Sequence, residues 1–426
     1  SSSCIKTVAS DIFGIPSMQY RYSKMKILQV NNVYKIGSTG KITYDLHKGL
    51  LERGIESIVC YGRGENYHEP HVYKVCGELD AKLNNLLSRI TGLMYGGSFF
   101  STYHLISIIK KEKPDVVHLQ CINGYFVNIF HLIEWLKRNH VKTVLTLHAE
   151  FMYTANCGYA FECNRWKIGC GHCPRLKRET KSWFLDRTAD SWEMMRRAFD
   201  GFHEDLIVTS VSPWLMDRAK QSPILQDKTH KVVLNGLDTE VFHPYNTKDL
   251  RKRFPAKKIV FHVTPSFTDD SRHVKGGYYV IQLAKMMANE DVLFLIAGNH
   301  SEKLQVPSNC ILLGKISDQC KLAQYYSMAD ITLLTSKKET FSMVTAESLC
   351  CGTPVVGFKA GGPEQIAIPE YSSFVEYGDL EALLKSVRSF LLSNMSSTDM
   401  WRSATERYSS INMIGEYCRI YRSIIS

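Results

Sequence analysis

The chain has 426 residues, of which 44% are hydrophobic and 22% are charged, and its formal net charge is +10. This length suits two domains better than one, and the composition is typical of a globular protein. No apolar run reaches the roughly 18 residues of a membrane span, and no low-complexity tract is present. The positive charge fits ordinary solubility, or an anionic partner such as a diphosphate or an acidic membrane surface.

The first segment, SSSCIKTVASDIFGIP, lacks the basic start and long apolar centre of a secretory signal. A strong strand pattern then begins at MKILQVNNV. We therefore expect residues 1–24 to be a leader, tag or upstream extension outside the fold.

In the first half, apolar β-rich runs alternate with amphipathic stretches such as residues 40–54 and 130–139. Continuous apolar runs separated by helical periodicity indicate parallel strands with helices on both faces of the sheet. The expected strands are 26–33, 56–63, 115–121, 142–149 and 206–213.

The second half repeats this scheme, so the sequence predicts two doubly wound α/β domains that face each other across a central cleft. In such sheets, ligands bind beyond the carboxyl ends of the strands. The expected strands of the second domain are 257–265, 291–298, 309–315, 329–336 and 353–360.

The boundary between the two domains is expected near Asn235-Gly236, a turn signal with Pro244 just beyond it. We assign residues 25–243 to the first domain and residues 244–410 to the second. The last stretch, 411–426, has the pattern of an aromatic-rich amphipathic helix. Its periodicity does not show where it packs, and we expect it to return to the first domain.

The 13 cysteines are odd in number and mostly scattered. Several, such as Cys60 and Cys121, lie in apolar strand-like runs, where reduced thiols serve as small core residues. This usage is typical of a reducing cytoplasm, and we expect a cytoplasmic protein.

The stretch ETFSMVTAESL carries Glu339 and Glu347, eight positions apart. Glu339 is expected on the loop after a strand, and residues 341–344 are expected to open a helix, whose free N–H groups suit a phosphate. Eight residues are close to two helical turns, so both carboxylates can project toward the cleft and accept from sugar hydroxyls. The pattern therefore fits a nucleotide-sugar, although two solvated helix glutamates would share the spacing.

The surrounding segment, SKKETFSMVTAESLCCGTPVVGFKAGGPEQI, closely resembles the carboxyl-terminal signature of retaining glycosyltransferases of family 4. That signature has two glutamates separated by seven residues, then a Cys-Gly-x-Pro-Val run and a Gly-Gly-x-x-Glu turn. The resemblance covers nearly the whole chain from Met25. It implies the GT-B fold, with an acceptor-binding first domain and a second domain that binds the donor, both Rossmann-like.

The resemblance also implies roles for individual residues. Glu347 should bind the ribose hydroxyls and Glu339 the donated sugar, while Lys275 in HVKGG should neutralise the donor diphosphate. Arg272 is the nearest substitute for an arginine that the family carries before this lysine. The base should pack on the backbone of Ile316. The other expected donor-site residues of this domain are Ser266, Thr340, Phe341, Ser342, Met343 and Val344.

In the first domain, Gly37, Ser38, Thr39 and Gly40 match the family's glycine-rich loop, where the backbone can approach a phosphate or acceptor closely. His148 matches a family histidine that contacts the donor sugar, but the aspartate that usually follows it is absent, because this chain reads HAE; whether Glu150 substitutes is left open by the sequence. A core histidine would fit the strand end equally well.

The sequence offers no convincing nucleophile, and the resemblance implies attack by the acceptor on the leaving-group face, with the departing phosphate taking the acceptor proton. Catalysis is then expected to need no metal or other cofactor.

A second cluster, CGYAFECNRWKIGCGHCP, carries Cys157, Cys163, Cys170 and Cys173. Four cysteines ending in Cys-x-x-Cys-Pro resemble a structural zinc knuckle, although the first spacings are not standard. Some polysaccharide-assembly members of the family carry a similar insert. We expect this insert, residues 157–173, to bind one structural zinc ion; packing thiols or disulfides are the alternatives.

The next stretch, 175–199, is basic with interleaved aromatic residues. Nothing resembling a nucleic-acid module accompanies it, so we expect no nucleic-acid partner. A solvated amphipathic helix and a surface for a lipid-linked acceptor or anionic membrane remain open.

Together these features predict a retaining glycosyltransferase that uses a UDP- or GDP-linked sugar. The expected acceptor is a saccharide or lipid-linked saccharide in the assembly of surface or capsular polysaccharide or lipopolysaccharide, at the inner face of the membrane. A nucleotide-sugar epimerase and a non-catalytic sugar-nucleotide binding protein are the alternatives. Donor turnover with and without acceptor separates the three.

Overall fold

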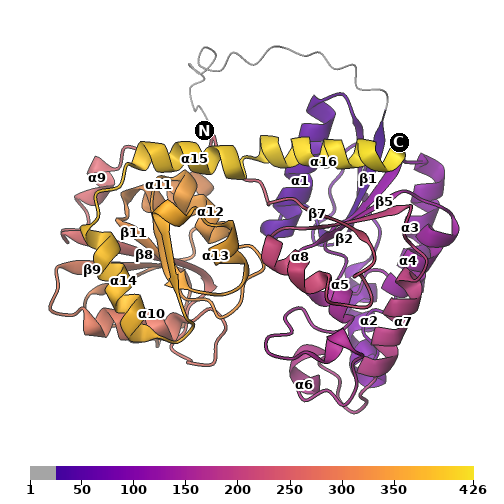
Figure 1. Cartoon of the computed structure of the whole chain (residues 1–426), viewed down its shortest axis with the longest axis horizontal. Helices are drawn as coiled ribbons and strands as arrows, with labels where there is room; N and C mark the ends of the chain where they lie inside the picture. Colours follow the sequence, from indigo (N-terminus) through magenta and orange to yellow (C-terminus); the bar gives the residue numbers. More distant parts are fainter. Residues whose placement is uncertain (1–24) are drawn as a thin grey trace.

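A computed structural model describes residues 25–426, so the expected leader, residues 1–24, lies outside the described chain. Two parallel sheets, one in each half, form the centres of two α/β units (Figure 1). This confirms the α/β GT-B architecture expected from the sequence. The first sheet contains, in spatial order, β3 (Val72–Lys74), β2 (Glu56–Arg63), β1 (Lys26–Val33), β4 (Val116–Leu119), β5 (Thr143–Leu147), β6 (Leu206–Ser210) and β7 (Thr229–Val232).

The second sheet has six strands in the same winding. In spatial order they are β10 (Cys310–Gly314), β9 (Val292–Asn299), β8 (Lys258–Ser266), β11 (Ile331–Leu334), β12 (Val355–Phe358) and β13 (Ser372–Val375). All described strand pairs in both sheets are parallel. The ten strands expected from apolar runs are confirmed. The three short edge strands β3, β7 and β13 were not expected, because they lack the continuous apolar run that the fourth edge strand, β10, has; Thr229–Val232, for example, is largely exposed.

Helices cover both sheets. In the first half they are α1 (Gly37–Glu52), α2 (Glu78–Thr91), α3 (Phe99–Glu112), α4 (Ile129–Arg138), α5 (Phe151–Thr154), α6 (Leu176–Glu179), α7 (Thr188–Phe199) and α8 (Pro213–Ala219). In the second half they are α9 (Lys248–Arg251), α10 (Gly277–Met286), α11 (Gln319–Met328), α12 (Met343–Cys350), α13 (Gly362–Ile366), α14 (Leu380–Leu392), α15 (Ser397–Tyr408) and α16 (Ser410–Ile425).

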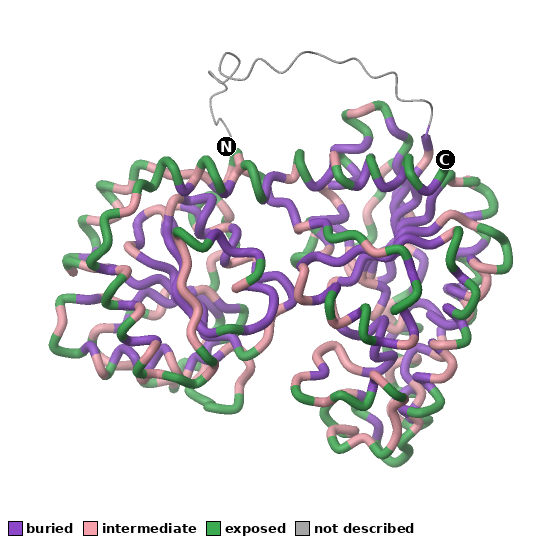
Figure 2. Tube along the Cα trace, viewed as in Figure 1, coloured by how far each residue is buried: buried purple, intermediate pink, exposed green. Residues whose placement is uncertain are grey.

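Buried residues concentrate on the strands of each unit, and exposed residues lie on the outer helices and loops (Figure 2). The basic stretch 175–199 is not one helix, because it divides into α6 and α7. The intervening turn is closed by Asp186, whose carboxylate accepts from Thr188 N at 3.0 Å.

Within residues 25–426, no helix combines the length and the apolar character needed to cross a membrane.

The final helix, α16, continues from α15 above the second sheet to the first half, where it packs against α1 (Figure 1). Its tyrosines enter the core of the first sheet. Tyr421 OH lies 2.7 Å from His118 Nδ1, and Tyr417 OH lies 3.0 Å from Thr146 Oγ1. The chain therefore crosses between the two halves twice, once near Leu237 and once after Tyr408. The two crossing segments are hydrogen-bonded to each other, because Leu237 N donates to Tyr408 O at 2.9 Å.

The strand orders place a switch point at the centre of each sheet, because β1 adjoins both β2 and β4, and β8 adjoins both β9 and β11. Crossover helices leave in opposite directions there, which opens a crevice at the carboxyl ends of the strands. The loops after β1, β5, β8 and β11 carry the candidate site residues.

Candidate active site

The loop between β11 and α12, which we call the donor loop after the ligand expected there, is held by backbone hydrogen bonds to two neighbouring segments. Glu339 N donates to Ala360 O at 3.0 Å, and Gly362 N donates to Glu339 O at 2.9 Å. On the other side, Lys337 N donates to Val274 O at 2.8 Å, which joins this loop to the one after β8. The position of Glu339 is thus fixed by backbone contacts rather than by its own side chain.

Lys275 and Glu339 form an ion pair, with 2.5 Å between Lys275 Nζ and Glu339 Oε1. Both side chains are partly buried, so their attraction is screened less than that of a surface pair. The turn at Gly276 allows this approach: its φ is +68°, and a Cβ there would lie 2.0 Å from Thr335 O. The structure therefore brings together the lysine expected at the donor diphosphate and the glutamate expected at the donated sugar.

Helix α12 begins at Met343, two residues later than expected. Ser342 is its N-cap and accepts from Thr345 N, whereas Phe341 is buried against Tyr408 instead of opening the helix. The helix ends at Cys350, and Gly352 follows with a left-handed φ of +76°, as a C-terminal cap favours.

Glu347 lies on the second turn of α12 and accepts a hydrogen bond from Tyr326 OH at 3.0 Å. Burial raises the pKa of this carboxyl group, while the tyrosine hydrogen bond and the charge of Lys41 oppose the rise. Lys41 belongs to α1, so the two halves act on each other electrostatically at this point. Tyr326 has no signal in the sequence, because its role depends on how α11 packs on α12.

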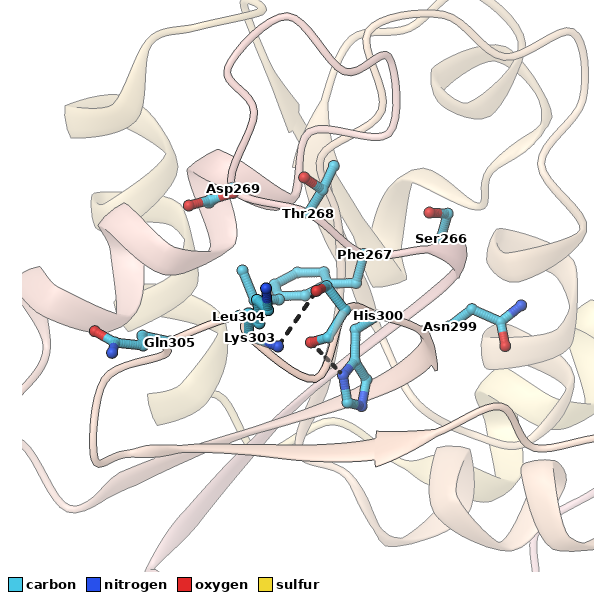
Figure 3. A pocket seen from close by; sticks show the side chains of 10 residues that line it. Ser266, Phe267, Thr268, Asp269, Asn299, His300, Lys303, Leu304 and Gln305 are labelled. Atoms are coloured by element: carbon cyan, nitrogen blue, oxygen red, sulfur yellow. Dashed lines mark hydrogen bonds between the residues drawn. The ribbon is translucent and has the colours of Figure 1, made fainter.

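A cavity of about 320 Å³ lies at the carboxyl ends of β8 and β9. Its lining includes Ile316 and Val344, two residues expected at the donor site, together with Lys315. Ser266 lines a neighbouring cavity of about 610 Å³, with Phe267, Asn299 and His300 around it (Figure 3). The second half thus offers adjoining spaces large enough for the parts of a nucleotide-sugar.

The segment Gly37–Gly40 is itself the first turn of α1 rather than a loop before it. Ile36 is the N-cap and supplies no side-chain hydrogen bond, and Gly40 O accepts from Lys35 N at 3.0 Å. The first amide groups of this 16-residue helix are not capped by a side chain, and they lie at the switch point of the first sheet.

His148 follows β5 and reaches the donor loop through its backbone. Thr340 Oγ1 donates to His148 O at 2.8 Å, and Ser212 Oγ donates to Thr340 O at 2.5 Å. The His148 ring lies 2.9 Å from Gln120 Oε1 through Nε2, which indicates the Nε2–H tautomer. Burial lowers the pKa of His148 to about 4, so the ring is neutral at physiological pH.

Arg272 shares the loop of Lys275 but points to solvent. Its side chain is 88% exposed and pairs with Asp270 at 3.2 Å. The structure therefore does not bring Arg272 together with the Lys275–Glu339 pair.

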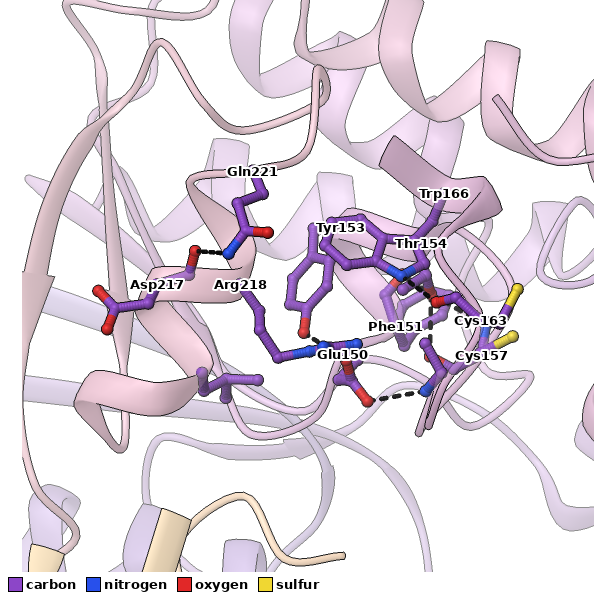
Figure 4. A network of polar contacts seen from close by, with 12 residues as sticks. Glu150, Phe151, Tyr153, Thr154, Cys157, Cys163, Trp166, Asp217, Arg218 and Gln221 are labelled. Carbon is purple, nitrogen blue, oxygen red and sulfur yellow. Dashed lines mark hydrogen bonds and ion pairs between the residues drawn. The ribbon is translucent and has the colours of Figure 1, made fainter. Parts of the chain in front are cut away.

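Glu150 is fully buried and is the centre of a polar network (Figure 4). Its carboxylate accepts from Arg218 Nε at 2.6 Å, from Tyr153 OH at 2.7 Å and from Ala160 N at 2.7 Å. The Arg218 guanidinium lies 5.2 Å from the ring centres of both Trp166 and Trp214. Glu150 therefore acts as a structural link between the His148 loop, the cysteine-rich insert and α8, a role that the HAE sequence does not reveal.

The link continues to the donor loop through Trp214. Gly361 packs so closely on this ring that a Cβ would lie 2.5 Å from it, and the φ of +110° at Gly361 also requires glycine. Lys338 Nζ also lies over the Trp214 ring, 5.1 Å from the ring centre. The carboxyl-terminal signature is thus docked on the first half as well as on its own sheet.

The four clustered cysteines are all free thiols, so the disulfide alternative is not observed. Burial raises the pKa of Cys157, and that of Cys170 to about 12, so both are protonated thiols without a metal ion and would release these protons on binding one. In the described part of the chain, no three His, Cys, Asp or Glu side chains are placed to hold a metal ion. The arrangement does not fit a preformed zinc site, and zinc binding stays a prediction.

Comparisons with known proteins agree with this geometry. Residues 39–241 match the family model described as Glycosyltransferase Family 4, and residues 267–407 match the one described as Glycosyl transferases group 1. The chain is 23% identical to the WcaC protein of Escherichia coli K12, named as a glycosyl transferase of colanic acid biosynthesis, over 94% of this chain and 100% of that protein. It is 26% identical to N-acetyl-alpha-D-glucosaminyl L-malate synthase of Bacillus anthracis, over 53% of this chain and 61% of that one.

Two solved structures share the fold. Sucrose-phosphate synthase from Thermosynechococcus elongatus superposes with a TM-score of 0.67 and 15% identity, covering 94% of this chain and 99% of that one. Anabaena HepE, solved in complex with UDP and glucose, gives a TM-score of 0.61 and 15% identity over 94% of this chain and 100% of that one.

We predict that Glu150→Gln lowers the free energy of unfolding by about 3 kcal/mol, because it leaves the Arg218 charge buried without its partner. Equilibrium urea unfolding measures this loss. The double variant Glu150→Gln/Arg218→Met removes both charges and should recover most of it. A single variant within about 0.5 kcal/mol of the parent would show that the pair is not a structural link.

Proposed function

Since this chain belongs to the family 4 glycosyltransferases with the GT-B fold, we propose that it transfers a sugar from a UDP- or GDP-linked donor with retention of anomeric configuration. The proposed acceptor is a saccharide or lipid-linked saccharide in the assembly of a surface polysaccharide. The naming of WcaC for colanic acid biosynthesis supports this acceptor class, and the UDP complex of HepE supports the donor class.

The observation that carries the proposal is the ion pair between Lys275 and Glu339, on the loops that follow β8 and β11, at the same edge of the sheet as the donor cavity. A lysine fixed at the carboxyl ends of the strands can neutralise the charge that develops on a nucleoside diphosphate as the glycosidic bond breaks. Glu339, the partner of this lysine in the ion pair, can accept hydrogen bonds from hydroxyl groups of the donated sugar. In the bound complex the diphosphate would replace Glu339 as the partner of Lys275, which leaves Glu339 free to bind the sugar on the other side of the bond to be broken.

Glu347 is the proposed ribose ligand. It lies further along α12 than Glu339 and is held by Tyr326, so one carboxylate oxygen is oriented by the protein and hydroxyls of a ribose can donate to the group. The base would then reach Ile316 in the adjoining cavity, where backbone groups can pair with it.

The proposed reaction needs no protein nucleophile. The acceptor hydroxyl attacks the anomeric carbon on the face from which the diphosphate leaves, and its proton passes to the departing phosphate oxygen. His148, neutral because burial lowers its pKa to about 4, adds no positive charge there and can contact the donated sugar. Lys275 stabilises the leaving group throughout.

The cellular site of the reaction and the peripheral membrane contact remain proposals that follow from the acceptor class. An acceptor linked to a lipid would be met at the inner face of the membrane.

The test of this function begins with a thermal-shift panel of UDP- and GDP-sugars, which identifies the donors that stabilise the protein, and turnover of these donors is then measured. Proton NMR of the sugar at the start of the reaction, transferred to an acceptor or slowly hydrolysed, should show the same anomeric configuration as in the donor. The inverted anomer would contradict retention. A changed sugar still attached to the nucleotide would identify an epimerase, and binding without turnover would identify a non-catalytic protein.

We predict that Glu347→Gln weakens binding of the nucleoside diphosphate by about 1.5–3 kcal/mol, because one hydrogen-bonded carboxylate contact is lost. The glutamine can still accept from Tyr326, so the fold should be retained. Calorimetric titration measures the affinity, and Glu381→Gln, an exposed glutamate of α14, is the matched control. An affinity equal to that of the control would remove Glu347 from the ribose site.

A further inference from the structure

A cavity of about 750 Å³ lies between the cysteine-rich insert and the second half of the chain. It is not the donor cavity, since it shares no lining residue with the space around Ile316 and Val344. We call it the arginine-rich cavity, after the residues Phe161, Arg165, Arg175, Arg178, Arg272 and Lys337 that line it from the two halves.

The charge of this cavity is strongly positive, because its lining contains five basic side chains and, among acidic ones, Glu162. Three of the basic groups are partly neutralised: Arg175 and Arg178 both pair with Glu179, and Arg272 pairs with Asp270 at 3.2 Å. Arg165 donates to the carbonyl of Gly171, and no ion pair within the described residues includes it or Lys337. A net positive potential therefore remains inside a concave space, where it is focused.

Phe161 is the point at which the two halves meet in the cavity. The guanidinium groups of Arg175 and Arg178 lie 4.5 Å and 5.8 Å from its ring centre, and Lys337 Nζ, from the second half, lies 5.8 Å from it. Phe161 has a left-handed φ of +50°, which is costly for an aromatic residue and needs support from its surroundings. Cation–π attraction to this ring thus offsets part of the repulsion among the three positive groups.

The cavity adjoins the proposed reacting centre. Arg272 is three residues before Lys275, and Lys337 is two residues before Glu339, on the two loops joined by the hydrogen bond from Lys337 N to Val274 O. The insert also approaches the centre: burial raises the pKa of Tyr159, and the charges of Glu339 and Glu150 raise it further. A ligand in the cavity would therefore lie beside the donated sugar, on the side open to an acceptor.

We propose that the arginine-rich cavity binds the diphosphate group of the acceptor, and hence that the acceptor is a diphosphate-linked saccharide. This inference rests on the proposed function and names the substrate class of the same reaction. Several guanidinium forks suit the multiple oxygens of a diphosphate, which they bind bidentately, better than a single carboxylate. The walls formed by Phe161, Tyr279 and Tyr377 offer apolar faces to the rest of the acceptor.

The test uses inorganic pyrophosphate as the probe, titrated calorimetrically into the full chain while excess nucleoside diphosphate occupies the donor cavity. The variant Arg165→Gln/Arg178→Gln should weaken pyrophosphate binding on the order of tenfold or more, because charge-assisted hydrogen bonds are lost. The matched control Lys177→Gln/Lys181→Gln removes the same charge from exposed positions of the same region outside the cavity, and should bind like the parent. Farnesyl diphosphate in place of pyrophosphate should show the same dependence if the acceptor is lipid-linked.

Three results would overturn the proposal: no second site for pyrophosphate, equal losses in the variant and the control, or glucuronate binding as tightly as pyrophosphate. Binding to phosphatidylglycerol vesicles that the arginine variant weakens, without pyrophosphate binding, would assign these arginines to a membrane surface instead. Failure of the proposed function would be seen separately, as absence of nucleoside diphosphate binding while the arginine-dependent pyrophosphate site persists.

Discussion

The constraint on which the site depends is the fixed loop from Lys337 to Ser342. It is hydrogen-bonded to the loop after β8 through Val274, to the turn before α13 through Ala360 and Gly362, and to the first half through Thr340. Each contact uses backbone groups or a short hydroxyl, so the geometry does not depend on long flexible side chains. A carboxylate on such a loop has little freedom to lose when a ligand binds.

The same loop explains how two separate sheets act as one site. Thr340 contacts the His148 carbonyl and Ser212, and the Trp214 ring packs on Gly361, so the donor loop is in contact with the ends of β5 and β6. The Glu150–Arg218 pair lies directly behind these contacts and fixes the insert to α8. The insert then forms one wall of the arginine-rich cavity, which places a positive surface next to the Lys275–Glu339 pair.

The fold was predictable from the sequence because both sheets are buried on two faces, so that their central strands are continuous apolar runs. The short edge strands β3, β7 and β13 were missed because they lack a continuous apolar run, which the fourth edge strand, β10, has. The family resemblance assigned Lys275, Glu339, Ile316 and Val344 to one donor site, but it did not predict the ion pair between Lys275 and Glu339. What the sequence did not show are contacts between distant segments: Tyr326 with Glu347, Glu150 with Arg218, and the exposed position of Arg272. Each depends on tertiary packing, which leaves no periodic signal.

The central claim is that Lys275 pairs with Glu339 until the donor binds, when the diphosphate replaces Glu339 as the partner of the lysine. The most direct measurement is calorimetric titration of the nucleoside diphosphate into the parent protein and into Glu339→Gln. The variant frees the lysine and removes a carboxylate that repels the ligand, so the affinity for the nucleoside diphosphate should rise by about three- to tenfold, while turnover of the nucleotide-sugar falls. An unchanged or weaker affinity in Glu339→Gln would contradict the account, because Lys275 would then not be the ligand of the diphosphate.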